Sequence, residues 1–273
     1  MILVTGANGN LGSATLAALR ARGATAIGGS RTPGDGMRRL DFDDHSGIGL
    51  GGVSTLVLIS AGYAEDDQVI GRHAAVLDAA AREGVRHVIY TSLTHAGDHL
   101  GFALAHRVTE RLVCACGLPW TILRNGLYAE LFGGLLMWSD NGVESAFGDG
   151  ALAAVARADL AEATAIISAD PTQHSGRTYD LVGTPITAAD VADRLGVPHR
   201  TIGLGEYRRR LLNEMPELLP FQPPMLSSIA TSIRHGFLDG ISPDLTDVLG
   251  RPVCDPLATA VAAASATRPG PAR

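Results

Sequence analysis

Three glycines in the stretch VTGANGNLG have the spacing of a phosphate-binding turn. Gly6, Gly9 and Gly12 follow an apolar run that begins at residue 2, and they precede a helical pattern. In such a turn the first glycine permits a sharp bend, the second lets the backbone approach a pyrophosphate, and the third lets the helix pack on the strand. The N-terminus of the helix then faces the anion. The stretch therefore predicts a dinucleotide-binding site.

The end of the second apolar run indicates which dinucleotide is bound. An acidic side chain there would bond the ribose hydroxyls of NAD and repel the 2′-phosphate of NADP. The sequence reads GGSRTPG instead, with no acid. Arg31 can make a bidentate, charge-assisted contact to a 2′-phosphate, with Ser30 beside it, although a solvated loop arginine is the alternative. We therefore expect NADPH as the cofactor.

Two further segments are expected to contact the cofactor. Asp41 and Phe42, in LDFDD after the third strand, are suited to flank an adenine by a hydrogen bond and a ring edge. Ser60 and Ala61 end the fourth strand, beside the other half of the cofactor. The two acids that follow Phe42 are expected to cap a helix.

Composition disfavours several other chemistries. All 22 residues of the Lys and Arg class are Arg, which removes Schiff-base chemistry and a P-loop. Cys114, Cys116 and Cys254 are too few and too badly spaced for a disulfide framework or a zinc cluster. His95 and His99 fall in a glycine-containing loop with no third ligand in register, so no metal site is expected.

A parallel sheet is needed to bring the candidate residues together. Apolar runs typical of strands buried on both faces occur at 2–6, 25–30, 54–60, 87–93 and 120–126, and a last strand is expected at 178–183. Helical patterns that end at or just before a glycine lie between the runs, at 11–22, 66–84 and 103–116. This alternation predicts an α/β fold, a Rossmann-type doubly wound parallel sheet with right-handed crossovers.

The alternation of strands and helices loosens after residue 127. We expect residues 1–127 to form the NAD(P)-binding Rossmann domain, with 151–183 returning to it. Segments 128–150 and 184–273 are expected to form a small C-terminal α/β lobe that binds the substrate. This small lobe would lean over the strand ends, where ligands of open α/β sheets bind.

Charge and hydropathy narrow the choice of partners. The formal net charge of -6 argues against a nucleic-acid partner, because affinity for phosphate backbones comes from clustered basic residues. The run 208–210 is basic and is expected on the solvent-exposed face of a helix. No apolar run reaches membrane-spanning length and no signal peptide precedes ILVTG, so we expect a cytoplasmic protein without membrane contacts. A homodimer is compatible with the sequence.

Several motifs together resemble the NmrA-like group of atypical short-chain dehydrogenases. They are TGANGNLG, Arg31 after the second strand, YTSL with HA closely following, LGFALAHRVTE and LPWTILRNGLYAE. The branch resembled most is that of the NAD(P)H:quinone oxidoreductases and triphenylmethane dye reductases. The likeness covers nearly the whole chain, including ARADLAEA, TYDLVG and LGRP. The first motif is widespread, whereas the combination of the others is much more specific.

The resemblance implies a set of cofactor contacts. The residues that would hold the adenosine diphosphate part are Gly6, Asn8, Gly9, Asn10, Leu11 and Arg31. Those that would surround the nicotinamide end are Thr91, Ser92, Asn125 and Gly126. His106 occupies a position that is Lys in much of the wider family, where it would lie against the nicotinamide ribose. The quinone-reducing branch is similar in having His there.

The proton donor of ordinary short-chain dehydrogenases is missing. Where they read Tyr-x-x-x-Lys, this sequence has Phe102 and His106. Reducing a ketone generates a strongly basic alkoxide, so a positioned acid contributes greatly to the rate. Hydride addition to a quinone gives a hydroquinone anion. Its conjugate acid resembles a phenol, with a pKa of about 10. Water can protonate such an anion, so quinones, cationic dyes or iminium-like acceptors are favoured.

Four side chains remain as candidate catalytic donors to the acceptor oxygen: Ser92, His106, Asn125 and Tyr128. For each one a structural role competes, namely satisfying a loop backbone, bonding a ribose hydroxyl, capping a strand or forming a wall. The acceptor is expected between the nicotinamide and a wall formed by Tyr128, Phe132 and the loop 95–102.

These features predict an NADPH-dependent reductase that transfers hydride to a quinone or a similar aromatic acceptor without a Tyr/Lys dyad. One alternative is an NADP-binding, redox-sensing regulatory protein of NmrA type without turnover. Another is a tailoring reductase of secondary metabolism that acts on a ketone or imine. Oxidation of NADPH by a small quinone distinguishes the regulator from both enzymes.

Overall fold

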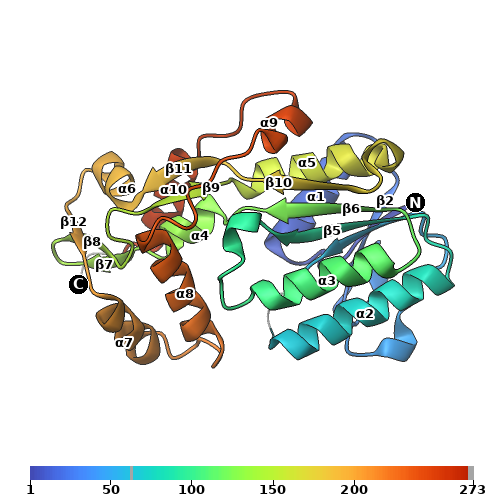
Figure 1. The fold of residues 1–273 in the computed structure, drawn as a ribbon, viewed down its shortest axis with the longest axis horizontal. Coiled ribbons are helices and arrows are strands. Elements are labelled where there is room, and N and C mark those ends of the chain that lie inside the picture. Colours follow the sequence, from blue (N-terminus) through green and yellow to red (C-terminus); the bar gives the residue numbers. More distant parts are fainter. Residues whose placement is uncertain (62–63, 270–273) are drawn as a thin grey trace.

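The centre of the molecule is a seven-stranded parallel sheet, seen in a computed structural model that describes residues 1–61 and 64–269 (Figure 1). The strand order is β10-β6-β5-β4-β1-β2-β3. The strands are β1 (Ile2–Val4), β2 (Ala26–Ser30), β3 (Arg38–Arg39), β4 (Thr55–Ile59), β5 (His87–Leu93), β6 (Trp120–Asn125) and β10 (Arg177–Leu181). The order reverses between β1 and β4, the kind of switch point where doubly wound sheets bind ligands. The predicted Rossmann-type sheet is confirmed.

Helices cover both faces of this sheet, and each face has its own apolar core. One face carries α1 (Asn10–Ala21) and α5 (Arg157–Ala169), and the other carries α2 (Asp66–Arg82) and α3 (Ala103–Ala115). In Figure 1, α5 lies above the sheet and α2 and α3 lie below it. All seven positions of β5 are buried. Burial from both sides explains why the strands read as unbroken apolar runs.

The six strands and three helices whose bounds were predicted begin and end within two residues of those bounds. Three short 3-10 helices, η1 (His45–Gly47), η2 (His95–Gly97) and η3 (Pro171–His174), lie in the connections. No helix within the described ranges is both long enough and apolar enough to cross a membrane.

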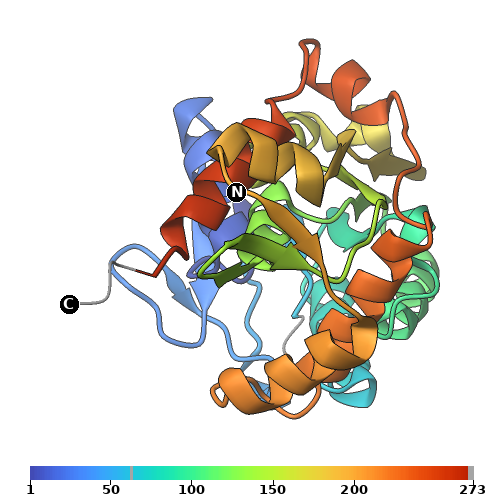
Figure 2. The same ribbon diagram turned by 90° about the vertical axis from the view of Figure 1, so that its left-hand side faces the viewer.

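Beyond β6 the chain builds two small sheets beside the strand ends, on the left in Figure 1. One pairs β9 (Ala151–Ala154) with β11 (Thr184–Thr187), and the other contains β7 (Met137–Ser139), β8 (Gly142–Ser145) and β12 (His199–Thr201). The helices here are α4 (Ala129–Gly134), α6 (Ala188–Leu195), α7 (Leu204–Glu214), α8 (Gln222–Arg234) and α10 (Pro256–Ala266). Figure 2 views these elements end-on, with the orange α7 below the green strands and α6 above them.

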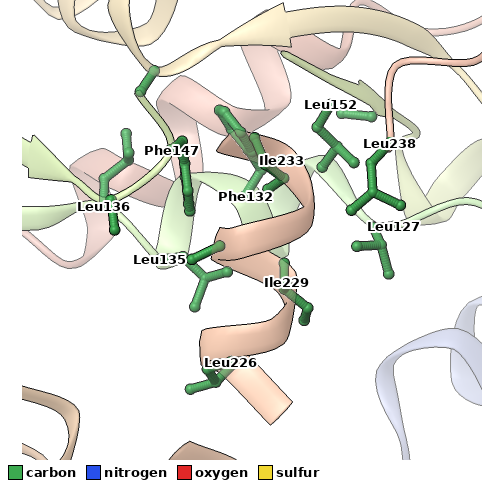
Figure 3. Close-up of a cluster of buried hydrophobic side chains, with 14 of the residues drawn as sticks. Leu127, Phe132, Leu135, Leu136, Phe147, Leu152, Leu226, Ile229, Ile233 and Leu238 are labelled. Atoms are coloured by element: carbon green, nitrogen blue, oxygen red, sulfur yellow. The ribbon is translucent and has the colours of Figure 1, made fainter. Parts of the chain in front are cut away.

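The core of this part is formed around α8, as Figure 3 shows. Leu226, Ile229 and Ile233 of α8 insert among the side chains of α4 and the neighbouring strands. The rings of Phe132 and Phe147 pack with their centroids 5.0 Å apart. Phe132 is fully buried. Its expected place in the wall of the acceptor pocket is therefore wrong, because its ring faces this core.

The partition of the chain differs in two places from the one expected. Strand β9, expected to return to the large sheet with 151–183, pairs instead with β11. The short helix α9 (Asp244–Leu249), expected in the small lobe, packs against α5 and β10 through Leu245 and Leu249. The apolar faces of these segments decide where they lie, since each fills the nearest unfilled core. Residues 270–273 of the expected lobe lie outside the described residues.

Candidate active site

The glycine-rich turn after β1 has the geometry of an anion site. Gly6 has a φ of 59°, in the left-handed region that glycine adopts freely. A Cβ at Gly12 would overlap the carbonyl group of Gly6, lying 2.7 Å from its carbon. Helix α1 starts after Gly9 without a side-chain cap. Its first N–H groups therefore have no acceptor within the helix and are available to an anion.

Asn8 joins this turn to the end of β2. Its side-chain amide donates to Ser30 Oγ at 2.8 Å and to the carbonyl oxygen of Thr32 at 2.9 Å. Arg31 lies between these two acceptors in the sequence and is exposed. Within the part of the chain that the structure describes, Arg31 forms no ion pair. An exposed guanidinium next to the anion site is suited to a second phosphate.

Asp41 and Phe42 follow β3, as predicted. Asp41 accepts a hydrogen bond from the backbone N–H of Asp43 at 3.1 Å, and the Phe42 ring is partly buried against the core under α2. Of the two acids expected to cap a helix, only Asp44 does so, since its carboxylate accepts from the N–H of Gly47 in η1. Asp43 instead binds Arg72 through two hydrogen bonds of 2.6 and 2.9 Å.

The ends of β4, β5 and β6 bring together the other predicted cofactor residues. Thr91 Oγ1 accepts from the N–H of Ser60 at 3.1 Å, and the N–H of Gly126 donates to the carbonyl of Leu181 at 2.8 Å. Asn125 is buried, and its Oδ1 has no hydrogen-bond partner among the described residues. A buried, unpaired amide oxygen costs about 1–3 kcal/mol. A bound ligand with a hydrogen-bond donor would remove that cost.

Ser92 is tied to a buried ion network rather than facing an open site. Its hydroxyl donates to Glu110 Oε1 at 2.6 Å. Arg107 and Arg124 bind the same carboxylate at 2.8 and 2.7 Å. Burial raises the pKa of Glu110, but hydrogen bonds from Arg124 and Ser92 and the charge of Arg107 outweigh it and hold the pKa below its usual value. The Ser92 proton is thus already committed, and this geometry favours a positioning role.

Arg107 also fastens the loop that follows β5. Its guanidinium donates to the carbonyl oxygens of Leu93 and Thr94, both at 2.9 Å. In the sequence, HRVTE contributed only to the resemblance, and no role was predicted for Arg107 or Glu110. Their spacing of three on one helix brings both to the same face, which is the feature that could have revealed the pair.

His106 lies on α3 with its Nδ1 3.0 Å from the Tyr90 hydroxyl. Burial lowers the pKa of His106 to about 4, with the charge of Arg107 acting in the same direction and that of Glu110 opposing it. The imidazole is therefore neutral at neutral pH. The Phe102 ring meets it edge-on, with centroids 6.3 Å apart.

Tyr128 lies where β6 passes into α4. Its ring is half-buried, and the guanidinium carbon of Arg157 lies over the ring, 4.7 Å from its centroid. Its backbone forms a bridge with Val155. The residue therefore stands at the junction of the large sheet and the small strands, next to the end of β6 that holds Asn125.

His73 was not identified from the sequence. It is fully buried on α2, and its Nε2 accepts from the N–H of Ala61 at 3.0 Å. Burial, aided by the charges of His106 and Arg72, lowers the pKa of His73 to about 3. The feature that could have revealed it is a histidine four residues after Val69 on the apolar face of an amphipathic helix.

Acidification should destabilise the protein through His73. The unfolded chain binds a proton on this imidazole near pH 6.5, whereas the folded protein does so only near pH 3. Between these values the unfolded state binds more protons, so the free energy of unfolding falls as the pH falls, by up to about 1.4 kcal/mol per pH unit. Urea unfolding across this window measures the slope. His73→Gln should show a slope shallower by that amount, and an unchanged slope would contradict the assignment.

The contacts of the other histidines and cysteines considered in the sequence do not indicate a metal site. His95 Nδ1 approaches Asp98 at 3.4 Å, and the His99 ring packs on Phe237 with centroids 4.6 Å apart. In residues 1–61 and 64–269, no three His, Cys, Asp or Glu side chains are grouped so that they could hold a metal ion. The three cysteines are free thiols.

The sheet, its switch point and the glycine turn define a Rossmann-type dinucleotide-binding protein. The chain is 34% identical over 199 residues to quinone oxidoreductase 2 of Escherichia coli strain K12, a match that covers 67% of this chain and 68% of that protein. It is 31% identical over 183 residues to the NmrA-like family domain-containing oxidoreductase flvB of Aspergillus flavus, over 60% of each chain. The chain belongs to the NmrA-like family, in the quinone oxidoreductase and triphenylmethane reductase branch.

Comparison with solved structures supports the same branch assignment. The triphenylmethane reductase of Citrobacter sp. complexed with NADP(H) superposes with a TM-score of 0.84 at 26% identity, covering 96% of this chain and 99% of that one. The NADPH-dependent quinone oxidoreductase 2 of Escherichia coli complexed with NADPH gives 0.82 at 28% identity, covering 95% and 98%. An NmrA mutant, at 16% identity and a TM-score of 0.72, shares the fold. No family model matches the chain.

Proposed function

We propose that this protein, an NAD(P)H-dependent oxidoreductase, uses NADPH to reduce a quinone or a similar conjugated acceptor. The observation that carries this proposal is that the three candidate donors beside the ends of β5 and β6 are uncharged, namely His106 on α3, Asn125 and Ser92. His106 has a pKa of about 4, Asn125 is an amide, and Ser92 donates its proton to Glu110. An acceptor whose reduced form is only weakly basic needs no acid stronger than these groups or water.

The residues of the chain fit NADPH at each of its parts. The N–H groups at the start of α1 suit the pyrophosphate, and Arg31 with Ser30 suits the 2′-phosphate. Asp41 and Phe42 after β3 are proposed to contact the adenine. The unpaired Oδ1 of Asn125 supplies an acceptor near the strand ends where the nicotinamide would lie. Bound there, NADPH supplies the hydride.

The protein's own contribution is to bind, orient and exclude water. The ion network around Glu110 holds the end of β5 and the loop after it in one geometry. Asn125 and His106 are the neutral groups able to hydrogen-bond a ribose hydroxyl or an acceptor oxygen. Orientation of this kind accounts for much of the acceleration in reactions that need no strong acid.

Two other functions make different predictions in one assay. Purified protein is mixed with NADPH and, separately, benzoquinone, menadione, a triphenylmethane dye, an aromatic ketone and an imine, and NADPH absorbance is followed. Turnover with quinones supports the proposal. NADPH binding without turnover on any acceptor would favour a redox-sensing regulator, and turnover confined to aromatic ketones or imines would favour a tailoring reductase.

Tyr128→Ala should raise the KM for the quinone while leaving the Kd for NADPH unchanged, because the ring is proposed to form one wall for the acceptor. An aromatic contact contributes about 0.5–1.5 kcal/mol, so we expect a KM increase of about 2- to 12-fold. Tyr128→Phe is the matched control, since it keeps the ring and removes only the hydroxyl. A normal KM in Tyr128→Ala would refute the wall, and a loss of kcat in Tyr128→Phe would make the hydroxyl the important group.

A further inference from the structure

A line of buried side chains connects the loop after β4 with His106. It runs from the N–H of Ala61 through His73, Thr109 and Tyr90. These residues come from α2, α3 and β5, on the face of the sheet that α2 and α3 cover (Figure 1). The direction of each hydrogen bond along this line can be worked out from its chemistry.

The hydrogen bonds in the first half of the line can run in only one direction. A backbone N–H can only donate, so His73 Nε2 accepts from Ala61 and carries no proton. His73 is fully buried and stays neutral, with a pKa of about 3, so its one proton is on Nδ1. That proton is donated to Thr109 Oγ1 at 2.8 Å. The Thr109 hydroxyl, itself fully buried, must direct its own proton elsewhere.

The second half leads to His106. Burial raises the pKa of the Tyr90 phenol, while the nearby Thr109 hydroxyl acts in the opposite direction. The phenol therefore keeps its proton, and its oxygen can accept the proton of the Thr109 hydroxyl. Its own proton then has an acceptor in Nδ1 of His106, 3.0 Å away.

We propose that Tyr90 donates to Nδ1 of His106 and so fixes His106 as the Nε2–H tautomer. In that form Nε2 is a neutral hydrogen-bond donor, suited to a ribose hydroxyl or an acceptor oxygen and unsuited to act as a base. Tyr90 and His73 are positioning residues in this arrangement. The nature of the group that Nε2 contacts rests on the proposed function, whereas the tautomer does not.

The surroundings of His106 support a neutral ring. Arg107 on the same helix opposes protonation and Glu110 favours it, while His73 from α2 and Tyr90 from β5 face the ring without charge. Without a fixed partner on Nδ1, a neutral imidazole can present either a donor or an acceptor at Nε2. Tyr90 removes that ambiguity.

The tautomer can be measured directly. In protein labelled with 15N-histidine and held near neutral pH, long-range 1H–15N correlations report which ring nitrogen carries the proton. The signals of His106 are assigned by their loss in His106→Asn. We expect Nε2 protonated and Nδ1 unprotonated in the wild type, and a mixture of tautomers in Tyr90→Phe. The wild-type spectrum is a test that does not depend on whether Tyr90→Phe folds.

A second tyrosine and histidine pair supplies the matched control. Tyr179 Oη lies 2.7 Å from His174 Nδ1, away from the strand ends that form the site. Tyr179→Phe removes the same hydroxyl from the same ring nitrogen, so it should change the signals of His174 and leave those of His106 and the turnover unchanged.

Kinetics then test the positioning role. Tyr90→Phe should lower kcat with NADPH and a small quinone by about tenfold, with little change in KM, because His106 is no longer held in one orientation. A protonated Nδ1 in wild-type His106, an unaltered His106 spectrum in Tyr90→Phe, or an unchanged kcat would each overturn the proposal. If the spectra change as expected while the wild type reduces no acceptor, the tautomer proposal stands and the proposed function falls.

Discussion

Gly12→Ala should abolish NADPH binding at concentrations that saturate the wild type. The added Cβ would lie 2.7 Å from the carbonyl carbon of Gly6, which is backbone and cannot move aside. The start of α1 would have to shift away from the turn, so its N–H groups would no longer converge on the pyrophosphate. We also expect a loss of about 1–3 kcal/mol in the free energy of unfolding, as for other overpacked sites.

The control for this substitution is Gly71→Ala in the middle of α2. A Cβ there meets nothing within 4 Å. Alanine in a helix interior is more stable than glycine by about 0.5–1 kcal/mol, so this variant should gain stability and bind NADPH normally. Calorimetric titration and urea unfolding measure both quantities. Wild-type NADPH affinity in folded Gly12→Ala would show that the turn is not the phosphate site.

Arg31→Ala should weaken NADPH binding by about 1.5–3 kcal/mol, roughly 10- to 150-fold, and barely change NADH binding. The reason is that Arg31 is exposed beside the Asn8 and Ser30 hydrogen bond, at the end of β2 where no acid competes for its charge. Hydrogen bonds from a guanidinium to a phosphate are charge-assisted and of this size. The ratio of the two dissociation constants is the quantity to measure.

Removal of a positive charge by itself needs a separate control. Arg86 is exposed just before the N-terminal end of β5, opposite the strand ends that carry the candidate site. Arg86→Ala changes the net charge equally and should leave the affinity for both cofactors unchanged. Equal losses for NADPH and NADH in Arg31→Ala would mean that Arg31 contacts a part the two cofactors share, and the preference for NADPH would need another cause.

Local features of the sequence were enough to predict the sheet and the glycine turn. Strands covered on both faces must be apolar at every position, and β5 is, so the run 87–93 could be read directly. The glycine turn is equally local, since Gly6, Gly9 and Gly12 act within a few residues of one another. The same holds for the missing acid after β2, which the sequence shows without any structure.

The connections around the candidate site depended on the tertiary structure. His73 meets Ala61, Tyr90 meets His106, and Ser92 meets Glu110 only because β4, β5, α2 and α3 pack against one another; these pairs are 12, 16 and 18 residues apart. Periodicity predicted that α2 and α3 have buried faces but not which polar groups would meet between them.

The positions of short segments, and the faces they bury, also depended on the tertiary structure. Helix α4 has six residues, too few for its pattern to show which face would be buried, and the core around α8 covers Phe132 instead of leaving it beside a pocket. Strand β9 and helix α9 are equally short and took the places where their few apolar side chains completed a core. The elements of the large sheet and the glycine turn could be predicted from the sequence, because they follow from local periodicity and backbone freedom. Tertiary packing decided which polar groups pair and which short segments cover them, because those choices depend on residues far apart in the chain.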